Sequence, residues 1–280
     1  MRKINLFENI TNRIISTIIL FFVIAMCSYS QKVDMEKLSD LKPRSIGPAG
    51  MSGRITAIEA IRSNPNVIYV GTASGGLWKS ETGGLSWKPI FDKQKVLSIG
   101  SLAINPNNPD EIWAGTGEGN PRNSLTGGYG IYKSIDGGEN WKCMGLEETR
   151  NIHRVLINPQ NTDIIYAGAI GSPWGDSENR GVYKTTDGGK TWKKVLYINE
   201  KTGPGDLVMD PSNPNKIIAG MWEHRRLPWF FESGGKGSGI YISHDGGGNW
   251  KKVTSKDGIP EGNIGRTGLA IAPSDANRVY

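Results

Sequence analysis

The sequence predicts an all-β protein, a β-propeller built from four-stranded antiparallel blades. The first observation is a phrase of the form Ser/Thr-x-Asp/Thr-Gly-Gly-x-x-Trp that occurs four times, with successive tryptophans 51 to 58 residues apart, at Trp87, Trp141, Trp192 and Trp250. A fixed period of this size indicates a repeat architecture. The second observation is that short alternating strands surround each copy, and the third is that no helical period of 3.6 residues lies between copies. Four-stranded units repeated radially are propeller blades.

Each copy of the phrase is predicted to be the hairpin turn between the third and fourth strands of a blade. Third strands are expected at 130–134, 181–185 and 239–243, and fourth strands at 141–143, 192–195 and 250–253. The aspartate can accept hydrogen bonds from backbone N–H groups one or two residues on, and the paired glycines supply positive φ angles. The tryptophan can then pack between neighbouring sheets. These structural roles are assigned to Asp136, Trp141, Asp187, Trp192, Asp245 and Trp250.

The first copy departs from this pattern because Thr82 stands where the other copies have aspartate. A threonine hydroxyl makes the same turn bond more weakly. The substitution is tolerable if the phrase only shapes a turn, so it favours a structural role over a catalytic one.

The first two strands of each blade are predicted from a second repeated pattern. An Asn- or Pro-containing turn precedes an apolar run at 64–71, 107–115, 161–168 and 213–220, and a fifth copy begins at Asn277. One more strand precedes each run, as at 99–104. Four blades and the start of a fifth are therefore visible, and because the sequence stops inside an apolar strand, we expect an N-terminal fragment of a longer propeller protein.

Residues 1–30 are predicted to be a secretory signal peptide. A basic start with Arg2, Lys3 and Arg13 precedes the uncharged run 14–26, and small residues precede Gln31, so cleavage is expected after Ser30. The mature protein would be secreted, periplasmic or at the cell surface, with a lead-in at 31–43 and the propeller at 44–280. Association with a membrane is expected only if Cys27 is lipidated, and the bulky Met26 before it favours simple cleavage.

Charge and cysteine content exclude several classes of function. The net charge is +6, or +4 without the predicted signal peptide, and the excess is spread along the chain. It does not form the clustered basic stripe of nucleic-acid binding, so no nucleic-acid partner is predicted. Cys143 is the only cysteine after residue 30, which excludes an internal disulfide bond. No cofactor and no metal site are predicted, because His153, His224 and His244 lie in different repeats or without converging ligands.

A candidate ligand site lies in the connections between second and third strands, which lengthen at 118–124, 172–180 and 222–231. They share one rim, opposite the repeated turns. Their aromatic, acidic and arginine residues suit a polysaccharide or a peptide or protein ligand. The candidate ligand-binding residues are Arg122, Trp174, Trp222, His224, Arg225 and Trp229. In the alternative interpretation, the aromatic residues only pack the long connection onto its blade, Arg225-Arg226 is a solvated pair, and His224 is an ordinary polar loop residue.

These phrases resemble a known family. The repeated turn is the Asp-box, or BNR repeat, and residues 44–280 resemble the sortilin-like and glycosyl-hydrolase-like (xyloglucanase-related) propellers of secreted bacterial proteins. The segments 44–54, 115–123 and 222–226 are similar to motifs of that group. The Asp-box is specific for fold and weak for function.

The resemblance implies two functions that differ in chemistry. Related xyloglucanases hydrolyse β-glucans with two aspartates, one of them in a Tyr-x-x-Thr-Asp pattern whose match here, 69–76, has Ala73 at the catalytic position. The first hypothesis is therefore a sortilin-like binding module without that aspartate. The second is a glycoside hydrolase that uses other carboxylates, with Glu118, Asp176 and Glu223 as candidates; an inverting pair should lie about 6.5–9.5 Å apart. The third is a scaffold for protein assembly, and whether the protein is an enzyme stays open.

Overall fold

The computed structural model describes Thr17 and residues 53–280. Apart from Thr17, the predicted signal peptide lies outside the described residues, as do the lead-in and most of the 44–54 motif. Within 53–280 the regular secondary structure consists of β-strands, apart from short 3-10 turns at Glu147–Thr149 and Ser255–Asp257. No helix in this part of the chain is long and apolar enough to cross a membrane.

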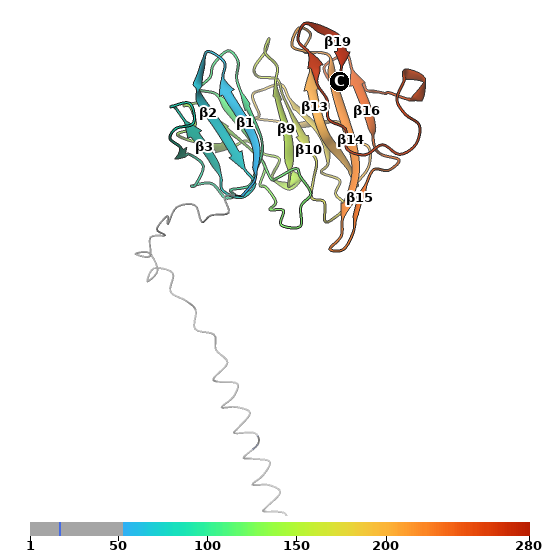
Figure 1. The fold of residues 1–280 in the computed structure, drawn as a ribbon, viewed down its shortest axis with the longest axis horizontal. Coiled ribbons are helices and arrows are strands. Elements are labelled where there is room, and N and C mark those ends of the chain that lie inside the picture. Colours follow the sequence, from blue (N-terminus) through green and yellow to red (C-terminus); the bar gives the residue numbers. More distant parts are fainter. Residues whose placement is uncertain (1–16, 18–52) are drawn as a thin grey trace, which may run out of the picture. The chain divides into compact units, whose positions relative to one another are not determined.

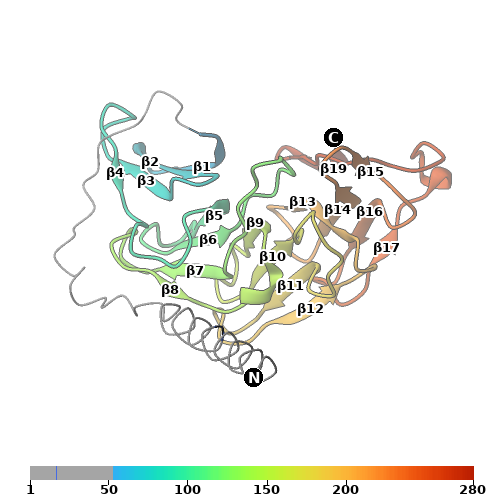
Figure 2. The same cartoon turned by 90° about the horizontal axis from the view of Figure 1, so that it is seen from below.

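Four antiparallel sheets follow one another along the chain, each with its strands in sequence order (Figures 1 and 2). Blade 1 consists of β1 (Ile55–Ile61), β2 (Asn64–Thr72), β3 (Leu77–Ser80) and β4 (Lys88–Pro89). Blade 2 consists of β5 (Ile99–Ile104), β6 (Ile112–Thr116), β7 (Ile131–Ser134) and β8 (Lys142–Cys143). Blade 3 consists of β9 (Ile152–Ile157), β10 (Ile165–Ala169), β11 (Gly181–Thr185) and β12 (Lys193–Leu196).

Blade 4 has the same order with one additional strand, β15, which pairs with β14. It consists of β13 (Thr202–Met209), β14 (Ile217–Arg226), β15 (Phe231–Ser233), β16 (Gly239–Ser243) and β17 (Lys251–Lys252). The hairpin of β18 (Ile271–Ala272) and β19 (Asp275–Val279) follows, where a fifth blade was predicted to start. The all-β propeller class predicted from the repeats is confirmed.

The first strands of the blades, β1, β5, β9 and β13, lie side by side and form the inner surface of the array. Their backbones approach closely. At Gly100 in β5, a Cβ atom would overlap the carbonyl oxygens of Gly117 and Ile152. Glycine at this position therefore allows the inner strands of blades 2 and 3 to meet.

The core lies between adjacent sheets rather than inside any one of them. One cluster joins blades 1 and 2 through Tyr69, Phe91 and Tyr132, and a second joins blades 2 and 3 around Trp113. Trp113 is fully buried. The apolar runs of β6 and β10 are buried on both faces because the sheets of blades 2 and 3 each have a neighbour on either side.

The Asp-box turns are closed by their own side chains. In blade 2, Asp136 Oδ1 accepts hydrogen bonds from Ser134 Oγ at 2.8 Å and from Asn140 N at 2.9 Å. The backbone donor is four residues on, not one or two as predicted, because Gly137 and Gly138 adopt φ of 65° and 95° and bring the chain back over the carboxylate. The predicted positive φ of the glycine pair is confirmed.

The other boxes repeat this geometry. Asp187 and Asp245 accept the equivalent bonds in blades 3 and 4. Hydrogen bonds from the backbone and side chain of Asn249 and from Ser243 hold the pKa of Asp245 below its ordinary value. In blade 1, Thr82 Oγ1 accepts a bond from Ser86 N at 2.9 Å, so the neutral hydroxyl closes the same turn.

The boxes of blades 2, 3 and 4 also contact the blade before them. Tyr69 Oη in β2 donates to the carbonyl of Gly137 at 3.1 Å, and Tyr166 Oη in β10 donates to that of Gly246 at 2.9 Å. At the equivalent position of β6, Trp113 instead packs edge-on against Trp192, with ring centroids 6.3 Å apart. An aromatic side chain of one blade therefore holds the box of the next.

Antiparallel pairing gives the array two opposite rims. The box rim carries the Asp-box turns together with the turns between first and second strands; Gly137 N, for example, donates to the carbonyl of Asp110 at 2.9 Å. The loop rim carries the connections 73–76, 117–130 and 170–180 and the tip of the β14–β15 hairpin, which is the lowest part of the sheets in Figure 1.

Candidate functional site

The loop rim contains a cavity of about 720 Å³ that we call the arginine pocket. It gathers residues from blade 1, from the 117–130 connection of blade 2, from the β14–β15 hairpin, and from the segment after blade 4. The lining residues are Arg54, Ile55, Asn120, Pro121, Arg122, Asn123, Trp222, Arg226, Phe231, Ser233 and Arg266. A pocket of this size can hold a small ligand or a segment of a chain.

The prediction that the blade 4 insertion begins as a loop at Trp222 was wrong, because β14 continues unbroken to Arg226. The extension pairs with β15, with His224 opposite Ser233 and Arg226 opposite Phe231. A hydrogen-bonded ladder places successive side chains on opposite faces, so Arg225 and Arg226 reach different neighbours. The insertion is thus a paired β-hairpin rather than an irregular loop.

Arg225 and Arg226 connect this hairpin to two other blades. Arg225 Nη1 lies 3.0 Å from Asp176 Oδ1 in the blade 3 connection. Arg226 donates through its backbone N to the carbonyl of Pro173 at 2.8 Å, and through Nη2 to Asn123 Oδ1 in the blade 2 connection. The hairpin is therefore fixed against both connections.

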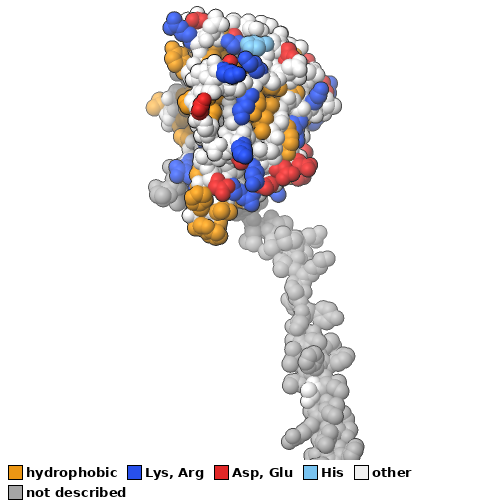
Figure 3. Space-filling view, turned by 90° about the vertical axis from the view of Figure 1, so that its right-hand side faces the viewer, with side chains coloured by type: hydrophobic (Ala, Val, Ile, Leu, Met, Phe, Trp, Pro, Cys, Tyr) orange, Lys and Arg blue, Asp and Glu red, His pale blue; other side chains and the backbone are white. Residues whose placement is uncertain are grey.

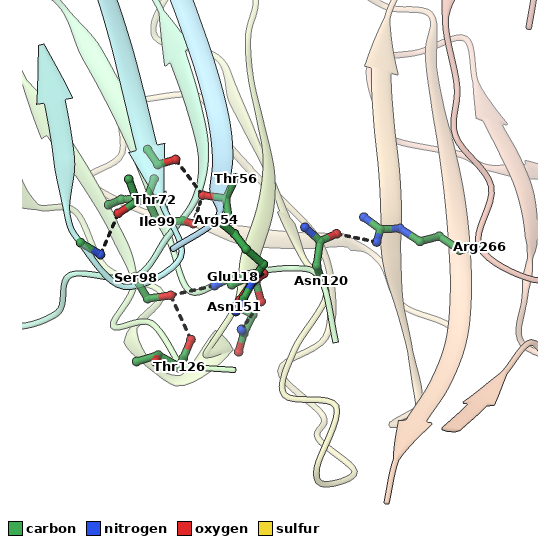
Figure 4. Close-up of polar contacts among 12 residues, drawn as sticks. Arg54, Thr56, Thr72, Ser98, Ile99, Glu118, Asn120, Thr126, Asn151 and Arg266 are labelled. Carbon is green, nitrogen blue, oxygen red and sulfur yellow. Dashed lines mark hydrogen bonds and ion pairs between the residues drawn. The ribbon is translucent and has the colours of Figure 1, made fainter. Parts of the chain in front are cut away.

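Arg266 connects the segment after blade 4 to blade 2. Its Nη1 donates to Asn120 Oδ1 at 2.8 Å, and Figure 4 shows the two side chains facing each other. Its Nη2 donates to His153 Nε2. Burial lowers the pKa of His153 to about 2, so the ring is neutral and can accept this bond.

Glu118 is fully buried behind the pocket and forms an ion pair with Arg54. Arg54 donates from Nε to Oε1 at 2.9 Å and from Nη2 to Oε2 at 2.6 Å. The backbone of Glu118 is fixed as well: its N–H donates to Ser98 Oγ at 3.0 Å, and its carbonyl accepts from Asn151 Nδ2 (Figure 4). Both oxygens of this catalytic candidate are occupied.

A buried arginine organises the blade 3 connection. Arg180 is fully buried and donates to the carbonyls of Ile170, Ser172, Gly175 and Lys201 at distances between 2.6 and 3.1 Å. Burial lowers its pKa to about 10. Arg180 Nη1 also lies 3.4 Å from His224 Nδ1. Because carbonyls of Ile170, Ser172 and Gly175 are among its partners, Arg180 fixes the path of 170–180 and with it the position of Asp176.

Trp222 and His224 were predicted to bind a ligand, but the structure buries both side chains. Both are buried, and their rings stack with centroids 4.2 Å apart and an interplanar angle of 14°. Trp222 also donates from Nε1 to Ser233 Oγ at 3.2 Å. Burial lowers the pKa of His224 to about 3, so it is neutral. Trp222 reaches the pocket wall, whereas His224 lies behind it in a strand and is not a loop residue.

The remaining predicted residues are not gathered at one point. Arg122 is exposed and lines the pocket. Trp174 is 38% exposed in the blade 3 connection, and Trp229 is 82% exposed at the hairpin tip, where hydrophobic side chains gather at the lower end of Figure 3. Glu223 accepts a hydrogen bond from Gly237 N at 2.7 Å. Glu118, Asp176 and Glu223 thus each have a different partner.

Six residues that line the pocket were not predicted to be site residues: Arg54, Asn120, Asn123, Arg226, Phe231 and Arg266. All but Arg266 lie in the family-like segments 44–54, 115–123 and 222–226 or in the insertion 222–231. Only the folded array brings together positions separated by up to 212 residues, from Arg54 to Arg266. If every arginine of the three predicted insertions had been included as a candidate, Arg226 would have been found. Arg266 would still have been missed, because it lies outside those insertions.

Two other features of the described residues bear on function. Within 53–280, no group of three or more His, Cys, Asp or Glu side chains is placed to hold a metal ion. A second cavity, of about 490 Å³, lies at the box rim and is lined by residues such as Arg62, Pro106, Pro159 and Met209.

Comparison with known proteins gives a consistent set of similarities. The family model described as Sortilin, neurotensin receptor 3 (Sortilin-Vps10) matches residues 129–260. A xyloglucanase from Paenibacillus sp is 24% identical over 294 residues, covering 93% of this chain and 27% of that protein. A probable oligoxyloglucan-reducing end-specific xyloglucanase from Neosartorya fischeri is 33% identical over 209 residues, covering 64% of this chain and 23% of that protein.

The solved structure of a GH74 enzyme from Niastella koreensis superimposes with a TM-score of 0.53 at 22% identity, covering 70% of this chain and 29% of that one. This likeness concerns the fold. The chain spans about a quarter of the length of the xyloglucanases it matches.

Proposed function

We propose that the loop rim of this chain, a sortilin-like and xyloglucanase-related Asp-box propeller, binds a polysaccharide. The observation that supports this most directly is the arginine pocket, where connections from separate blades form one cavity. Its wall combines the aromatic residues Trp222 and Phe231 with amides and arginines. Aromatic faces suit the apolar faces of sugar rings, and amides and guanidinium groups suit hydroxyl and acidic oxygens.

The test is binding of the chain to a panel of soluble polysaccharides, measured by affinity electrophoresis and calorimetry. Phe231→Ala, in the pocket wall, should weaken the binding that the panel detects. Trp229→Ala is the matched aromatic control because Trp229 lies at the exposed hairpin tip and outside the pocket lining. Loss of binding in Trp229→Ala alone would place the ligand at the tip, as the sequence-based candidate list allowed, and would contradict the pocket.

A second candidate function is hydrolysis of a β-glucan, favoured by the similarity to xyloglucanases over most of the chain. The described geometry offers less to support it. Arg54 engages Glu118, Arg225 engages Asp176, and Ala73 stands at the position where the resemblance expects an aspartate. Release of reducing ends from xyloglucan by the chain, abolished by Asp176→Asn or Glu223→Gln, would favour this function over binding alone.

Peptide or protein binding competes with the polysaccharide proposal because the sortilin-like family model matches residues 129–260. A peptide screen run beside the polysaccharide panel separates the two. Binding of a peptide, with no binding to any polysaccharide of the panel, would favour the peptide function. Recovery of a stable protein complex without sugar binding would favour a scaffold.

We also propose that the protein acts outside the cytoplasm, on the basis of the signal-peptide pattern at 1–30. N-terminal sequencing of the protein recovered from its producing cells should begin at Gln31. A chain that keeps Met1, or one that carries lipid on Cys27, would contradict simple cleavage.

A further inference from the structure

The arginine pocket carries more positive charge than its surroundings neutralise. Among the described residues, four arginines line it and no aspartate or glutamate does. Within residues 53–280, Arg54 has an ion pair with Glu118, whereas Arg122, Arg226 and Arg266 have no carboxylate within ion-pair distance. None of these three guanidinium groups therefore has a paired carboxylate among residues 53–280; Asp206, which pairs with Arg154, acts on Arg266 only from beyond ion-pair distance.

The hydrogen-bond partners of two of these arginines are neutral. Arg226 donates to the amide oxygen of Asn123, and Arg266 donates to that of Asn120 and to the neutral ring of His153. These bonds orient the guanidinium groups and leave their charge in place. The Nε of Arg226 is buried and has no hydrogen-bond partner.

Aromatic rings hold the same two guanidinium groups. Arg226 Cζ lies 5.2 Å from the centroid of the Phe231 ring, and Arg266 Cζ lies 5.4 Å from that of Trp222. A stacked and hydrogen-bonded guanidinium is already oriented, so less conformational freedom is lost when it binds an anion. Planar forks of this kind match the two oxygens of a carboxylate.

We infer that the arginine pocket binds an acidic polysaccharide, whose carboxylate-bearing sugar units pair with Arg122, Arg226 and Arg266. This inference rests on the proposed polysaccharide function and specifies its ligand class. A neutral sugar would take these charges out of water without pairing them, whereas a carboxylate supplies the missing partner. The amides of Asn120 and Asn123 remain beside it to contact hydroxyl groups.

The experiment compares hexagalacturonate, a neutral xyloglucan oligosaccharide and hexaglutamate as probes, by calorimetry on the 280-residue chain. Hexagalacturonate should bind at least about tenfold more tightly than the neutral probe. Its affinity should fall when salt rises from about 0.1 M to about 1 M, because salt screens charge pairs at the surface.

Two charge-neutralising variants test the residues. Arg122→Gln, at an exposed position, and Arg226→Gln should each weaken hexagalacturonate binding by about tenfold. Arg62→Gln is the matched control, since Arg62 is an exposed arginine at the box rim, and it should leave the affinity unchanged. Circular dichroism of the Arg122→Gln variant confirms that a loss of binding is not a loss of fold.

The outcomes separate this inference from the function on which it rests. Equal affinity for the neutral and acidic sugars, or unchanged affinity in both arginine variants, would overturn the inference and leave polysaccharide binding intact. Absence of binding to either sugar would overturn both. Binding of hexaglutamate without hexagalacturonate, lost in Arg122→Gln, would replace the polysaccharide by an acidic peptide.

Discussion

Replacement of Glu118 by glutamine separates a structural role of this carboxylate from a catalytic one. The side chain is fully buried and holds both hydrogen bonds of the Arg54 guanidinium. Glutamine keeps the shape but removes the charge, so charge-assisted bonds become neutral ones. The Arg54 side chain is 36% exposed and can be partly rehydrated, so we expect a loss of about 2 kcal/mol in the free energy of unfolding. This corresponds to a fall of roughly 4–8 °C in Tm for a domain of this size.

Removal of the partner, Arg54, should lower the free energy of unfolding by more than Glu118→Gln does. Arg54→Ala leaves a carboxylate that is fully buried and has lost its cationic partner, for which about 3–5 kcal/mol is expected. The double variant should cost less than the sum of the two, because the residues are in direct contact. Thermal and urea unfolding followed by circular dichroism measure all three values.

The matched control is Glu139→Gln, since Glu139 pairs with Lys88 at 3.0 Å but both side chains are more than half exposed. We expect it to change stability by less than about 1 kcal/mol. If Glu118→Gln were as mild as this control and also abolished ligand binding or hydrolysis, Glu118 would act on a ligand and the structural reasoning would be refuted.

Two further predictions concern the joints between blades, and a third concerns the closure of an Asp-box turn. Trp113→Ala should cost about 3–5 kcal/mol because it empties a fully buried site against Trp192, whereas Trp113→Phe should cost clearly less; urea unfolding distinguishes them. Gly189→Ala should lower Tm, because the φ of Gly189 is +89° and the new Cβ would lie 2.6 Å from the Trp113 ring. Gly175→Ala is the control and should have little effect on Tm, because the space around Gly175 is open. The pKa of Asp187 is lowered by hydrogen bonds from Thr191 and Thr185, so its contribution to stability is present above the unfolded pKa of about 3.9 and is lost as pH falls through the lower folded pKa. Asp187→Asn should therefore reduce the pH dependence of stability below about pH 4, and an unchanged acid-unfolding profile would contradict the lowered pKa.

The blade pattern could be read from local signals because each of them acts over a few residues. The third strands were predicted to within one residue, since alternation and the glycine pair fix where Gly181–Thr185 begins and ends. The position of the Asp136 hydrogen bond was predicted less well. It depends on how two consecutive positive φ angles direct the chain, which composition alone does not give.

The blade 4 insertion shows the limit of such signals. Trp222 and His224 are residue types that are common in binding loops, but the extended β14–β15 pairing buries them. The exposed end of the hairpin begins only after Arg226. Whether a polar or aromatic side chain faces solvent or a neighbouring strand depends on pairing partners that lie elsewhere in the chain.

By itself the sequence determined the repeat, the turn chemistry of the boxes and the succession of four-stranded sheets, because these depend on contacts between residues close together in the chain. Only the tertiary structure decided that Arg54, Arg226 and Arg266 line one cavity and that Glu118 is sealed behind it. Those placements depend on how whole blades pack against each other, and that packing brings together positions far apart in the chain without leaving a local pattern at any of them.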